Sequence, residues 1–292
     1  MVVLSFITRN SYTKMLKAPV SLREVLDSTL QIPYRQIILV DDSTDETREF
    51  FQSWCEEHDK ELTVSGSRLY GYHRPTRATA RQTAIDIFLD GFDDGWLMFV
   101  DDDVILNPGW WREAEAYLSD PRIGMVWGLN FDATSDRHVY LKALGIDYVQ
   151  YLIKEFFRRG GTHDTLVRRE ALEGIRIPPE LHFFEDWYIL RYVQQRGYSI
   201  GIVKTGVTHY NPEWNYSTKT IKQMAYLSRK YGVEPPTLGY AVYRLFRSLA
   251  SIIPTMYASV KGFGLREGLR RAYHRWRLKV LYRIYFLRGG AP

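Results

Sequence analysis

The sequence predicts an α/β protein with a mostly parallel central sheet, because apolar runs of strand length alternate with helical patterns through its first half. A second observation indicates the same class. The apolar run Trp96–Val100 ends on three consecutive acids, Asp101, Asp102 and Asp103, and buried strands of parallel sheets are continuous apolar runs of this kind. Ligands of open α/β sheets bind at the carboxyl ends of strands, so we expect a functional site at these acids.

The expected strands of the first half are Val2–Ile7, Gln36–Val40, Glu61–Val64, Trp96–Val100 and Ile123–Leu129. Further along, Ser199–Thr208 is a run rich in β-forming residues. Between these parts, residues 132–161 have a looser pattern that is typical of a long functional excursion, with one helix expected around Leu141–Phe157.

Three helices are expected between the first strands. One begins near Ser21, where Ser-Leu-Arg-Glu predicts a capping box with Glu24. Another begins at Ser43, where Ser-Thr-Asp-Glu predicts the same motif with Glu46. The third covers residues 76–89.

The 292 residues suffice for one large domain with an appendage, which we expect to be residues 1–235 and residues 236–292. The distribution of charge supports this division. Residues 244–292 contain eleven basic residues and one acid, Glu267, for a net charge of +10, whereas the whole chain carries +5. The rest of the chain therefore carries −5, and a basic tail on an acidic body indicates an anionic surface as partner.

Cysteine usage and the length of apolar runs indicate where the protein works. The single Cys55 excludes an internal disulfide framework and a thiolate metal site, which favours a reducing compartment. The first residues, Met1–Ile7, lack the basic leader and cleavage site of a signal peptide, so we expect them to be a strand. No stretch reaches the roughly 18 uninterrupted apolar residues of a membrane-spanning helix.

Three adjacent carboxylates repel one another, and a divalent cation held by their oxygens would neutralise them. We therefore expect Mg²⁺ or Mn²⁺ at this strand end. Side chains alternate along an extended chain, which predicts Asp101 and Asp103 on one side and Asp102 on the other. The alternative is that the acids stabilise the N-terminus of a helix that opens at Asn107-Pro108, although one acid would suffice there.

A second acidic pair, Asp41 and Asp42, follows another expected strand and suits hydrogen bonds to a nucleobase or ribose. The Gly-rich fingerprints of Rossmann dehydrogenases and P-loop enzymes are absent from the sequence, so phosphate would be bound by metal and arginine. Arg77 and Arg81 lie at i and i+4 of the third expected helix and suit this role. For Arg77 alone, a solvated helix face is an equally good explanation.

These motifs, taken in order with a later Glu-Asp pair at residues 185–186, resemble the family 2 glycosyltransferases of the GT-A fold over about residues 1–215. Within this family, the chain resembles the membrane-associated enzymes of cellulose-synthase-like and dolichyl-phosphate-sugar type. The resemblance implies a nucleoside-diphosphate sugar donor and Mn²⁺ or Mg²⁺ as cofactor, which would make the nucleoside diphosphate a better leaving group. The residues implied to hold the donor are Thr8, Arg9, Asn10, Asp41, Asp42, Arg77, Arg81, Asp101 and Asp102.

The implied metal ligands are Asp103, Asp101 and His209. His209 stands where several enzymes of this fold keep a metal-ligating histidine, and an ordinary polar role is its alternative. The Gln-x-x-Arg-Trp motif of the family's processive polysaccharide synthases does not follow the Glu-Asp pair, which argues against processive synthesis.

Glu185 and Asp186 lie among aromatic residues at the expected start of a helix. Acids at a helix N-terminus are ordinary, but the resemblance implies that this pair is catalytic. Asp186 would be the general base that takes a proton from an acceptor hydroxyl while the anomeric carbon inverts. The acceptor side is expected to include His163, Asp164 and Trp187.

From residue 265 onward, apolar residues recur at helical spacing and arginines fill most of the other positions. Such a helix typically lies in the plane of a membrane interface, with basic residues toward anionic headgroups. Arg283 lies on the apolar side, where its guanidinium would extend to the interface. A basic helix packed on its own catalytic domain is the alternative. No recognised nucleic-acid module accompanies the charge, so we expect no nucleic-acid partner.

Together these observations predict an inverting, metal-dependent glycosyltransferase at the cytoplasmic face of the cell membrane. We expect GDP-mannose as donor, ahead of UDP-glucose, and a hydroxyl of a membrane glycolipid or lipid-linked oligosaccharide as acceptor. The alternatives are a polyprenyl-phosphate sugar synthase and, outside enzymes, a membrane-binding module. A haloacid-dehalogenase-type phosphatase is disfavoured because Ile105 stands where its motif has Thr or Val. A sugar nucleotidyltransferase is disfavoured because residues 2–12 lack its Gly-rich segment and lysine.

Overall fold

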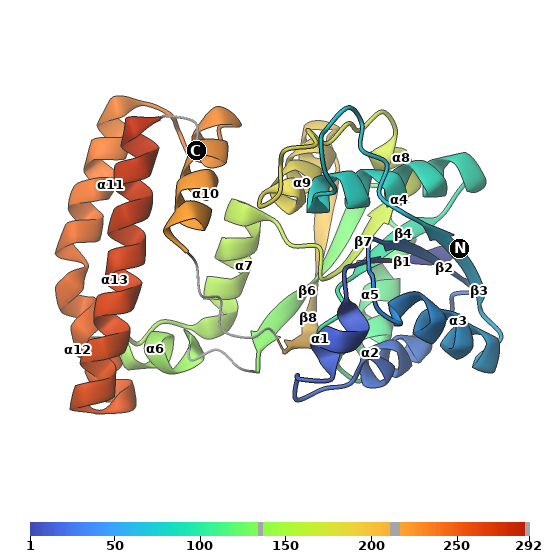
Figure 1. Ribbon diagram of the computed structural model, residues 1–292, viewed down its shortest axis with the longest axis horizontal. Coiled ribbons are helices and arrows are strands. Elements are labelled where there is room, and N and C mark those ends of the chain that lie inside the picture. The colour runs from blue at the N-terminus through green and yellow to red at the C-terminus, as the bar shows by residue number, and fades with distance from the viewer. Residues whose placement is uncertain (134–136, 211–216, 290–292) are drawn as a thin grey trace. The chain divides into compact units, whose positions relative to one another are not determined.

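The computed structural model of the protein describes residues 1–133, 137–210 and 217–289 (Figure 1). The chain folds into two compact units. Unit 1 comprises Met1–Thr134 and Arg159–Pro212, and unit 2 comprises Ser135–Arg158 and Glu213–Pro292. These are units of packing. The expected division into a catalytic part, residues 1–235, and an attachment part, residues 236–292, is one of function and stays a prediction.

Unit 1 contains an eight-stranded sheet with the order β3-β2-β1-β4-β7-β6-β8-β5 among the described residues. The strands are β1 Val2–Thr8, β2 Gln36–Asp41, β3 Glu61–Ser65, β4 Trp96–Val100, β5 Val104–Leu106, β6 Ile123–Asp132, β7 Asp164–Arg168 and β8 Ser199–His209. The neighbours β3, β2, β1 and β4 are all parallel, and so are β6 and β8, whereas β7 and β5 are antiparallel to their neighbours. The predicted mostly parallel sheet is confirmed, and each of the six expected runs forms a strand.

The helices of unit 1 cover both faces of this sheet. They are α1 Ser11–Met15, α2 Leu22–Ser28, the short 3₁₀ helix η1 Thr29–Gln31, α3 Thr47–Glu57, α4 Arg77–Gly91, α5 Trp110–Leu118, α8 Arg169–Leu172 and α9 Glu185–Gln195. Figure 1 shows α4, α8 and α9 on one side of the sheet and α2, α3 and α5 on the other.

The capping motifs fix where two of these helices begin. Ser21 and Glu24 form the predicted capping box of α2, and Thr76 caps α4 at the predicted start of the third helix. The capping box predicted at Ser43 is wrong, because α3 begins at Thr47 without a side-chain cap from its N-cap residue. The Ser43 hydroxyl instead accepts a hydrogen bond from the backbone N–H of Asn10, at 2.6 Å.

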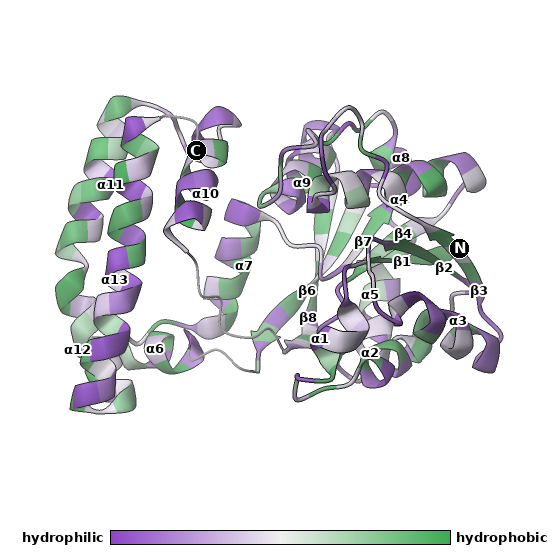
Figure 2. Ribbon diagram, in the orientation of Figure 1, coloured by the Kyte–Doolittle hydropathy of each residue, from purple (hydrophilic) through white to green (hydrophobic). Residues whose placement is uncertain are grey.

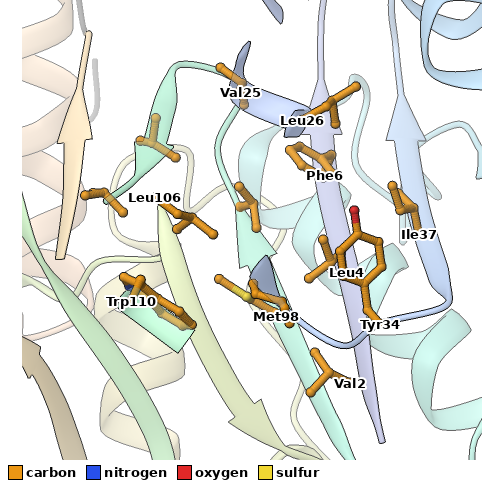
Figure 3. Close-up of a cluster of buried hydrophobic side chains, with 14 of the residues drawn as sticks. Val2, Leu4, Phe6, Val25, Leu26, Tyr34, Ile37, Met98, Leu106 and Trp110 are labelled. Carbon is orange, nitrogen blue, oxygen red and sulfur yellow. The ribbon is translucent and has the colours of Figure 1, made fainter. Parts of the chain in front are cut away.

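The core on one face of the sheet is formed by β1, β4, α2 and α5. Figure 3 shows Leu4 and Phe6 of β1 with Met98 of β4 among these side chains, and all three are fully buried. Each such side chain contributes about 1.5–3 kcal/mol when it leaves water. The register of β1, which pairs Thr8 with Asp41 and Phe6 with Val100, brings the carboxyl ends of β1, β2 and β4 to one edge.

The helices of unit 2 are α6 Arg137–Ala143, α7 Tyr148–Arg159, α10 Thr218–Lys230, α11 Leu238–Ala250, α12 Ile252–Phe263 and α13 Leu265–Arg288. The single helix expected around Leu141–Phe157 is wrong in extent. The chain forms two helices there because Gly145, with a φ of 69°, takes a left-handed turn between them. Within unit 2, α11 and α12 run alongside α13 (Figure 1).

The basic helix expected from residue 265 is present as α13, but its apolar side is not free. Ala272 and Phe286 are fully buried, and Gly268 lets α13 approach the backbone of α12 near Ser259. Arg283, expected to extend toward a membrane interface, is instead buried in an ion pair with Glu234. That expectation is wrong, because the apolar stripe of α13 packs against other helices of unit 2.

Hydrophobic residues are visible along the sheet and also along α11 and α12 in Figure 2. None of the helices in the described parts of the chain combines the length and the apolar character needed to cross a membrane.

Candidate active site

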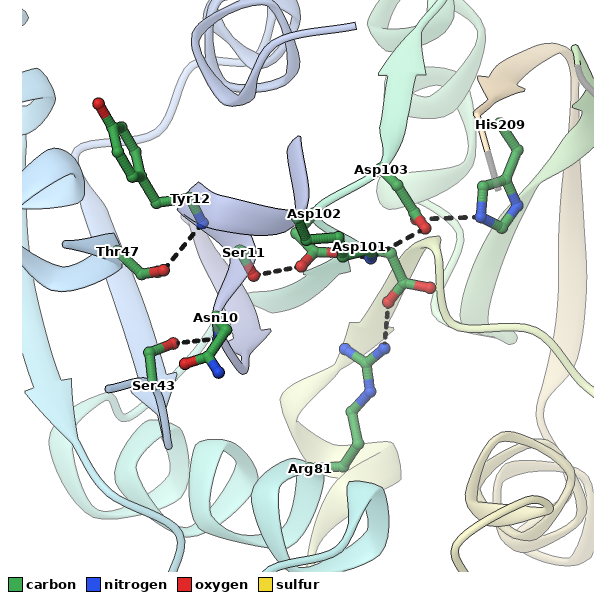
Figure 4. Close-up of polar contacts among 11 residues, drawn as sticks. Asn10, Ser11, Tyr12, Ser43, Thr47, Arg81, Asp101, Asp102, Asp103 and His209 are labelled. Atoms are coloured by element: carbon green, nitrogen blue, oxygen red, sulfur yellow. Dashed lines mark hydrogen bonds and ion pairs between the residues drawn. The ribbon is translucent and has the colours of Figure 1, made fainter. Parts of the chain in front are cut away.

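The three acids after β4 have different partners, as Figure 4 shows. Asp101 contacts Arg81 of α4, whereas Asp102 and Asp103 both contact Lys14 of α1. The alternation expected for these side chains does not apply, because residues 102 and 103 form a turn between β4 and β5 and not an extended strand. The turn separates Asp101, which pairs with Arg81, from Asp102 and Asp103, which share Lys14.

Arg81 binds Asp101 with 2.5 Å between Nη2 and Oδ1. Its side chain is buried, and its guanidinium lies 4.9 Å from the centre of the Phe99 ring. Burial would raise the pKa of Asp101, but attraction to Arg81 outweighs it and the pKa is lowered, so the carboxylate is charged. Nε and Nη1 of Arg81 are buried without a hydrogen-bond partner. Such buried donors without a partner are rare in proteins.

Asp103 is held at the other end of the acid turn by β8. Its Oδ1 lies 3.0 Å from Nε2 of His209, and the amide nitrogen of Asn130 lies 3.1 Å from Nδ1 of the same ring. Burial opposes ionisation of Asp103, but the hydrogen bond with His209, together with Lys14, holds the pKa of this carboxyl well below its usual range. The structure thus brings together two of the three predicted metal ligands, Asp103 and His209.

The predicted pair His163 and Asp164 lies at the start of β7. Asp164 is fully buried and accepts a hydrogen bond from Nε1 of Trp110 at 2.7 Å, and its other oxygen lies 2.9 Å from Nδ1 of His163. A fully buried carboxylate has no surface to offer an acceptor, so Asp164 acts by orienting its neighbours. The His163 ring stands edge-on to His209 at 5.9 Å, which places it beside the predicted metal ligands His209 and Asp103.

The tips of β1 and β2 meet as predicted. The hydroxyl of Thr8 donates to Asp41 at 2.7 Å, and Asp41 is buried. Asp42 is less buried and accepts a hydrogen bond from the backbone N–H of Ser67 at 3.1 Å. Of this acidic pair, Asp42 is therefore more accessible to a nucleotide. Asp41 instead holds the tips of β1 and β2 together through its hydrogen bond with Thr8.

Asn10 adopts a left-handed conformation with a φ of 55° at the turn into α1. Its side-chain oxygen accepts the backbone N–H of Thr44 at 2.8 Å, which ties the β1 tip to the loop after β2. The neighbouring Arg9 is exposed. The predicted segment Thr8-Arg9-Asn10 thus lies beside Asp41 and Asp42.

Glu185 and Asp186 begin α9, where Glu185 is buried and Asp186 is half-buried. Burial, followed by repulsion from Asp186, raises the pKa of Glu185 to about 8. Burial also raises the pKa of Asp186, although the backbone N–H of Trp187 donates to it at 2.7 Å. Gly160 passes so close that a Cβ there would lie 2.4 Å from the Asp186 backbone, which explains the glycine with its φ of 78°.

Arg77, in the first turn of α4, connects this carboxylate pair with the acids after β4. Its charge acts on Glu185 and Asp186 as well as on Asp101 and Asp103. The predicted base motif and two of the predicted donor-site acids therefore both lie within electrostatic reach of one guanidinium. The same arginine, after burial and together with Arg74 and Arg9, lowers the pKa of His182 to about 4. His182 is thus neutral in a strongly positive environment that suits an anion.

In the described parts of the chain, no three His, Cys, Asp or Glu side chains are grouped closely enough to hold a metal ion alone. Asp103 and His209 nevertheless form a carboxylate and imidazole pair, and Asp101 lies near enough to act on Asp103 electrostatically. Mg²⁺ is usually bound through one or two carboxylates together with substrate phosphates and water. The residues present therefore fit a divalent cation that completes its coordination with a diphosphate.

Sequence reasoning missed three polar residues of this site: Ser11, Lys14 and Ser67. Ser11 donates to Asp102 beside Lys14, and Ser67 donates to Asp42. Ser67 follows β3 at the same sheet edge, and the rule that located the acids would have located it. Ser11 and Lys14 lie on the five-residue helix α1, which is too short for a periodic signal.

The sequence matches the model of Glycosyl transferase family 2 over residues 12–175, more than half of the chain. Among curated proteins, none matches. Many solved structures have a similar fold, among them the following three, and at their low identity the likeness establishes the fold alone.

The mannosyltransferase PcManGT from Pyrobaculum calidifontis, in complex with GDP-Man and Mn²⁺, has a TM-score of 0.56 and 17% identity over 99% of this chain and 85% of that chain. S. aureus TarS 1-349, in complex with UDP-GlcNAc, has a TM-score of 0.54 and 16% identity over 98% of this chain and 90% of that chain. Glucosyl-3-phosphoglycerate synthase from Mycobacterium tuberculosis, in complex with Mn²⁺, UDP and phosphoglyceric acid, has a TM-score of 0.51 and 16% identity over 80% of this chain and 79% of that chain.

The family match includes β2, α4, β4 and the acids that follow β2 and β4. The eight-stranded mixed sheet, the strand-tip acids and the similar solved structures agree with it on the GT-A fold. The chain therefore belongs to glycosyl transferase family 2.

Proposed function

We propose that the protein is an inverting, metal-dependent hexosyltransferase that moves mannose from GDP-mannose onto a hydroxyl of a membrane glycolipid or lipid-linked oligosaccharide. One observation carries this proposal. Arg77 lies within electrostatic reach of both the Glu185–Asp186 pair and the acids after β4, so a candidate base and a candidate donor site share one location. Membership of a glycosyltransferase family argues against the alternative of a non-enzymatic membrane-binding module.

The donor site combines strand-tip acids with arginine. Asp42 and Asn10 offer hydrogen bonds to a base and ribose at the β1 and β2 tips, and the buried Asp41 holds the β1 tip through Thr8. Arg77, which is exposed, offers a guanidinium to the oxygens of a diphosphate, and the buried Arg81 keeps Asp101 charged. Asp103 and His209, with Asp101, would hold Mn²⁺ or Mg²⁺, which when bound neutralises charge on the leaving nucleoside diphosphate. Metal in two of the similar structures supports this cofactor.

The donor is the least constrained part of the proposal. The similar structures bind GDP-Man in one case and UDP-GlcNAc or UDP in others. We favour GDP-mannose because, of these three structures, the one in complex with it has the highest TM-score, 0.56 against 0.54 and 0.51. Release of nucleoside diphosphate from a panel of GDP and UDP sugars, with and without Mn²⁺, would test the choice. Faster release from UDP-glucose than from GDP-mannose would contradict it.

Asp186 is the proposed general base. It is half-buried and can reach an acceptor, whereas Glu185 is buried with Oε2 unpaired. The raised pKa of Asp186 improves its ability to accept a proton from a hydroxyl. A phosphate oxygen is already an anionic nucleophile and needs no such base. The carboxylate pair therefore favours a hydroxyl acceptor over the alternative of a polyprenyl phosphate.

Asp186→Asn is expected to leave donor binding intact and to slow transfer by roughly 10² to 10⁴, the range for loss of a general base. Donor affinity is measured by calorimetry and transfer by product formation on lipid-linked sugars. Asp147→Asn, at a carboxylate just before α7, is the matched control, and we expect it to transfer at the parental rate. Parental transfer by Asp186→Asn, or preference for bare polyprenyl phosphate, would contradict the hydroxyl acceptor.

We also propose that residues 236–292 attach the protein to an anionic membrane at its cytoplasmic face. The support comes from α11 and α12, which carry a set of exposed apolar side chains that we call the apolar ridge. Its members are Leu238, Val242, Tyr243, Phe246, Leu249, Ile253, Met256 and Tyr257. The sequence has no acid between Glu234 and Glu267, Lys261 lies in the last turn of α12, and Arg266 follows that helix. This combination suits an anionic lipid interface.

A further inference from the structure

Lys14 of α1 bridges two of the three acids that follow β4. Its Nζ lies 2.8 Å from Oδ1 of Asp102 and 3.2 Å from Oδ2 of Asp103. The other oxygen of Asp103 lies 3.0 Å from His209. Both oxygens of the carboxylate that we assign to a divalent cation therefore already have a protein partner, and one of these partners is a positive charge.

The backbone of α1 is held independently of this contact. The N–H of Tyr12 donates to the Thr47 hydroxyl at 3.0 Å, and the N–H of Thr13 donates to Asp45 at 2.8 Å. The Lys14 side chain is 40% exposed. Its ammonium can therefore leave Asp103 by a change of rotamer while α1 stays in place.

From this geometry we propose that Lys14 is a built-in counter-ion of the metal site. Its ammonium occupies Oδ2 of Asp103 until a divalent cation displaces it, and it then binds the diphosphate of the donor. The inference rests on the proposed metal-dependent transfer. It adds a residue that sets the affinity for the metal and the dependence of that affinity on bound nucleotide.

The physical reason is that an ammonium and a divalent cation cannot share one carboxylate oxygen. Mg²⁺ requires its oxygen ligands at about 2.0–2.1 Å, and two cations held that close repel each other. The contact with Asp103 is longer than the contact with Asp102, by the two distances given above, so it is the one that breaks at lower cost. Asp102 retains the lysine near the site.

A coupling between metal and donor follows. Metal that binds alone leaves Lys14 with Asp102 as its one carboxylate partner, whereas a bound diphosphate supplies new oxygens for the ammonium. The metal and the nucleoside diphosphate should therefore bind cooperatively, and by linkage each should tighten the other by the same factor.

Lys14→Met tests this, because it removes the charge and keeps a long side chain. Mn²⁺ binding is measured from the electron paramagnetic resonance signal of free Mn²⁺, first without nucleotide and then with GDP or UDP. Without nucleotide, Lys14→Met is expected to bind Mn²⁺ about fivefold or more tightly than the parent. The enhancement of Mn²⁺ binding by nucleotide is expected to shrink. Lys17→Met, which removes the charge of an exposed lysine three residues on, is the matched control.

Without nucleotide, Mn²⁺ affinity of Lys14→Met equal to or weaker than that of Lys17→Met would overturn the role of Lys14. Lys14→Gln repeats the comparison with a polar side chain and guards against misfolding of one variant. Asp103→Asn is expected to abolish Mn²⁺ binding in either background. A parent protein that binds no Mn²⁺ even with nucleotide would instead contradict the proposed function, so the two failures are distinguishable.

Discussion

Glu185 shows how a single buried carboxylate can link the site to stability. Its pKa is raised from 4.5 to about 8 by burial and by the adjacent Asp186. Between these two pH values the folded protein binds a proton that the unfolded chain has released. Stability therefore falls as pH rises through this window.

Glu185→Gln is isosteric and does not titrate, so the fall in stability caused by ionisation of Glu185 should disappear in this variant. The stability of the variant relative to the parent is expected to increase from pH 5 to pH 8, as measured by urea unfolding at several pH values. Glu57→Gln is the control, because Arg23 lowers the pKa of the exposed Glu57 and keeps it ionised throughout this range. A difference between Glu185→Gln and the parent that does not change with pH would contradict the raised pKa.

At the same scale, the acids of the site were predictable and their partners were not. Asp101, Asp102 and Asp103 could be located because a buried parallel strand is an apolar run and its carboxyl end is where ligands bind. Their pairing with Arg81, Lys14 and His209 depends on contacts between residues 20 or more positions apart. Local pattern carries no information about such contacts.

At the scale of elements, hydrophobic pattern located six strands but missed β5 and β7. β5 has three residues and follows the turn that contains the acids. β7 has five residues and lies between β4 and β6 in the sheet. Short antiparallel strands are chosen by the neighbours they pair with, and sequence propensity alone does not specify them. The start of α3 was misplaced for a similar reason, since Ser43 bonds to Asn10 across the sheet edge.

The apolar ridge of α11 and α12 leads to an element-scale prediction about membrane attachment. Phe246 and Ile253 are 66% and 75% exposed, so replacing both with Asp should not disturb packing. Each apolar side chain that enters a membrane contributes on the order of 1.5–3 kcal/mol. Phe246→Asp with Ile253→Asp should therefore weaken binding to phosphatidylglycerol vesicles at least about tenfold.

Co-sedimentation with vesicles at low salt measures this binding. Leu30→Asp with Leu69→Asp adds the same charge at exposed apolar residues of unit 1 and is the matched control. Unchanged binding by the ridge variant, or an equal loss in the control, would show that α11 and α12 do not form the membrane contact.

At the scale of the whole molecule, the C-terminal segment is both a charged surface and a part of a folded core. Arg229 of α10 donates to the carbonyls of Phe286 and Leu287, each at 2.8 Å, and Glu234 pairs with the buried Arg283. Breaking such a buried ion pair typically costs about 3–5 kcal/mol. Removing residues 244–292 would therefore unpair groups in α10 and the segment after it, in addition to removing basic charge.

Deleting residues 244–292 is accordingly expected to unfold what remains of unit 2, residues 135–158 and 213–243, while unit 1 retains its own sheet and core. Scanning calorimetry should lose heat absorption attributable to unit 2, and binding of a hydrophobic dye should rise because Ala225 and Ala241 lose the contact with Phe286 and become exposed. GDP or UDP binding should persist, since the candidate donor residues all lie in unit 1. If nucleotide binding is lost together with unit 2, the two units do not fold independently. The ridge variants, which leave Arg283 and Phe286 in place, then become the proper test of attachment.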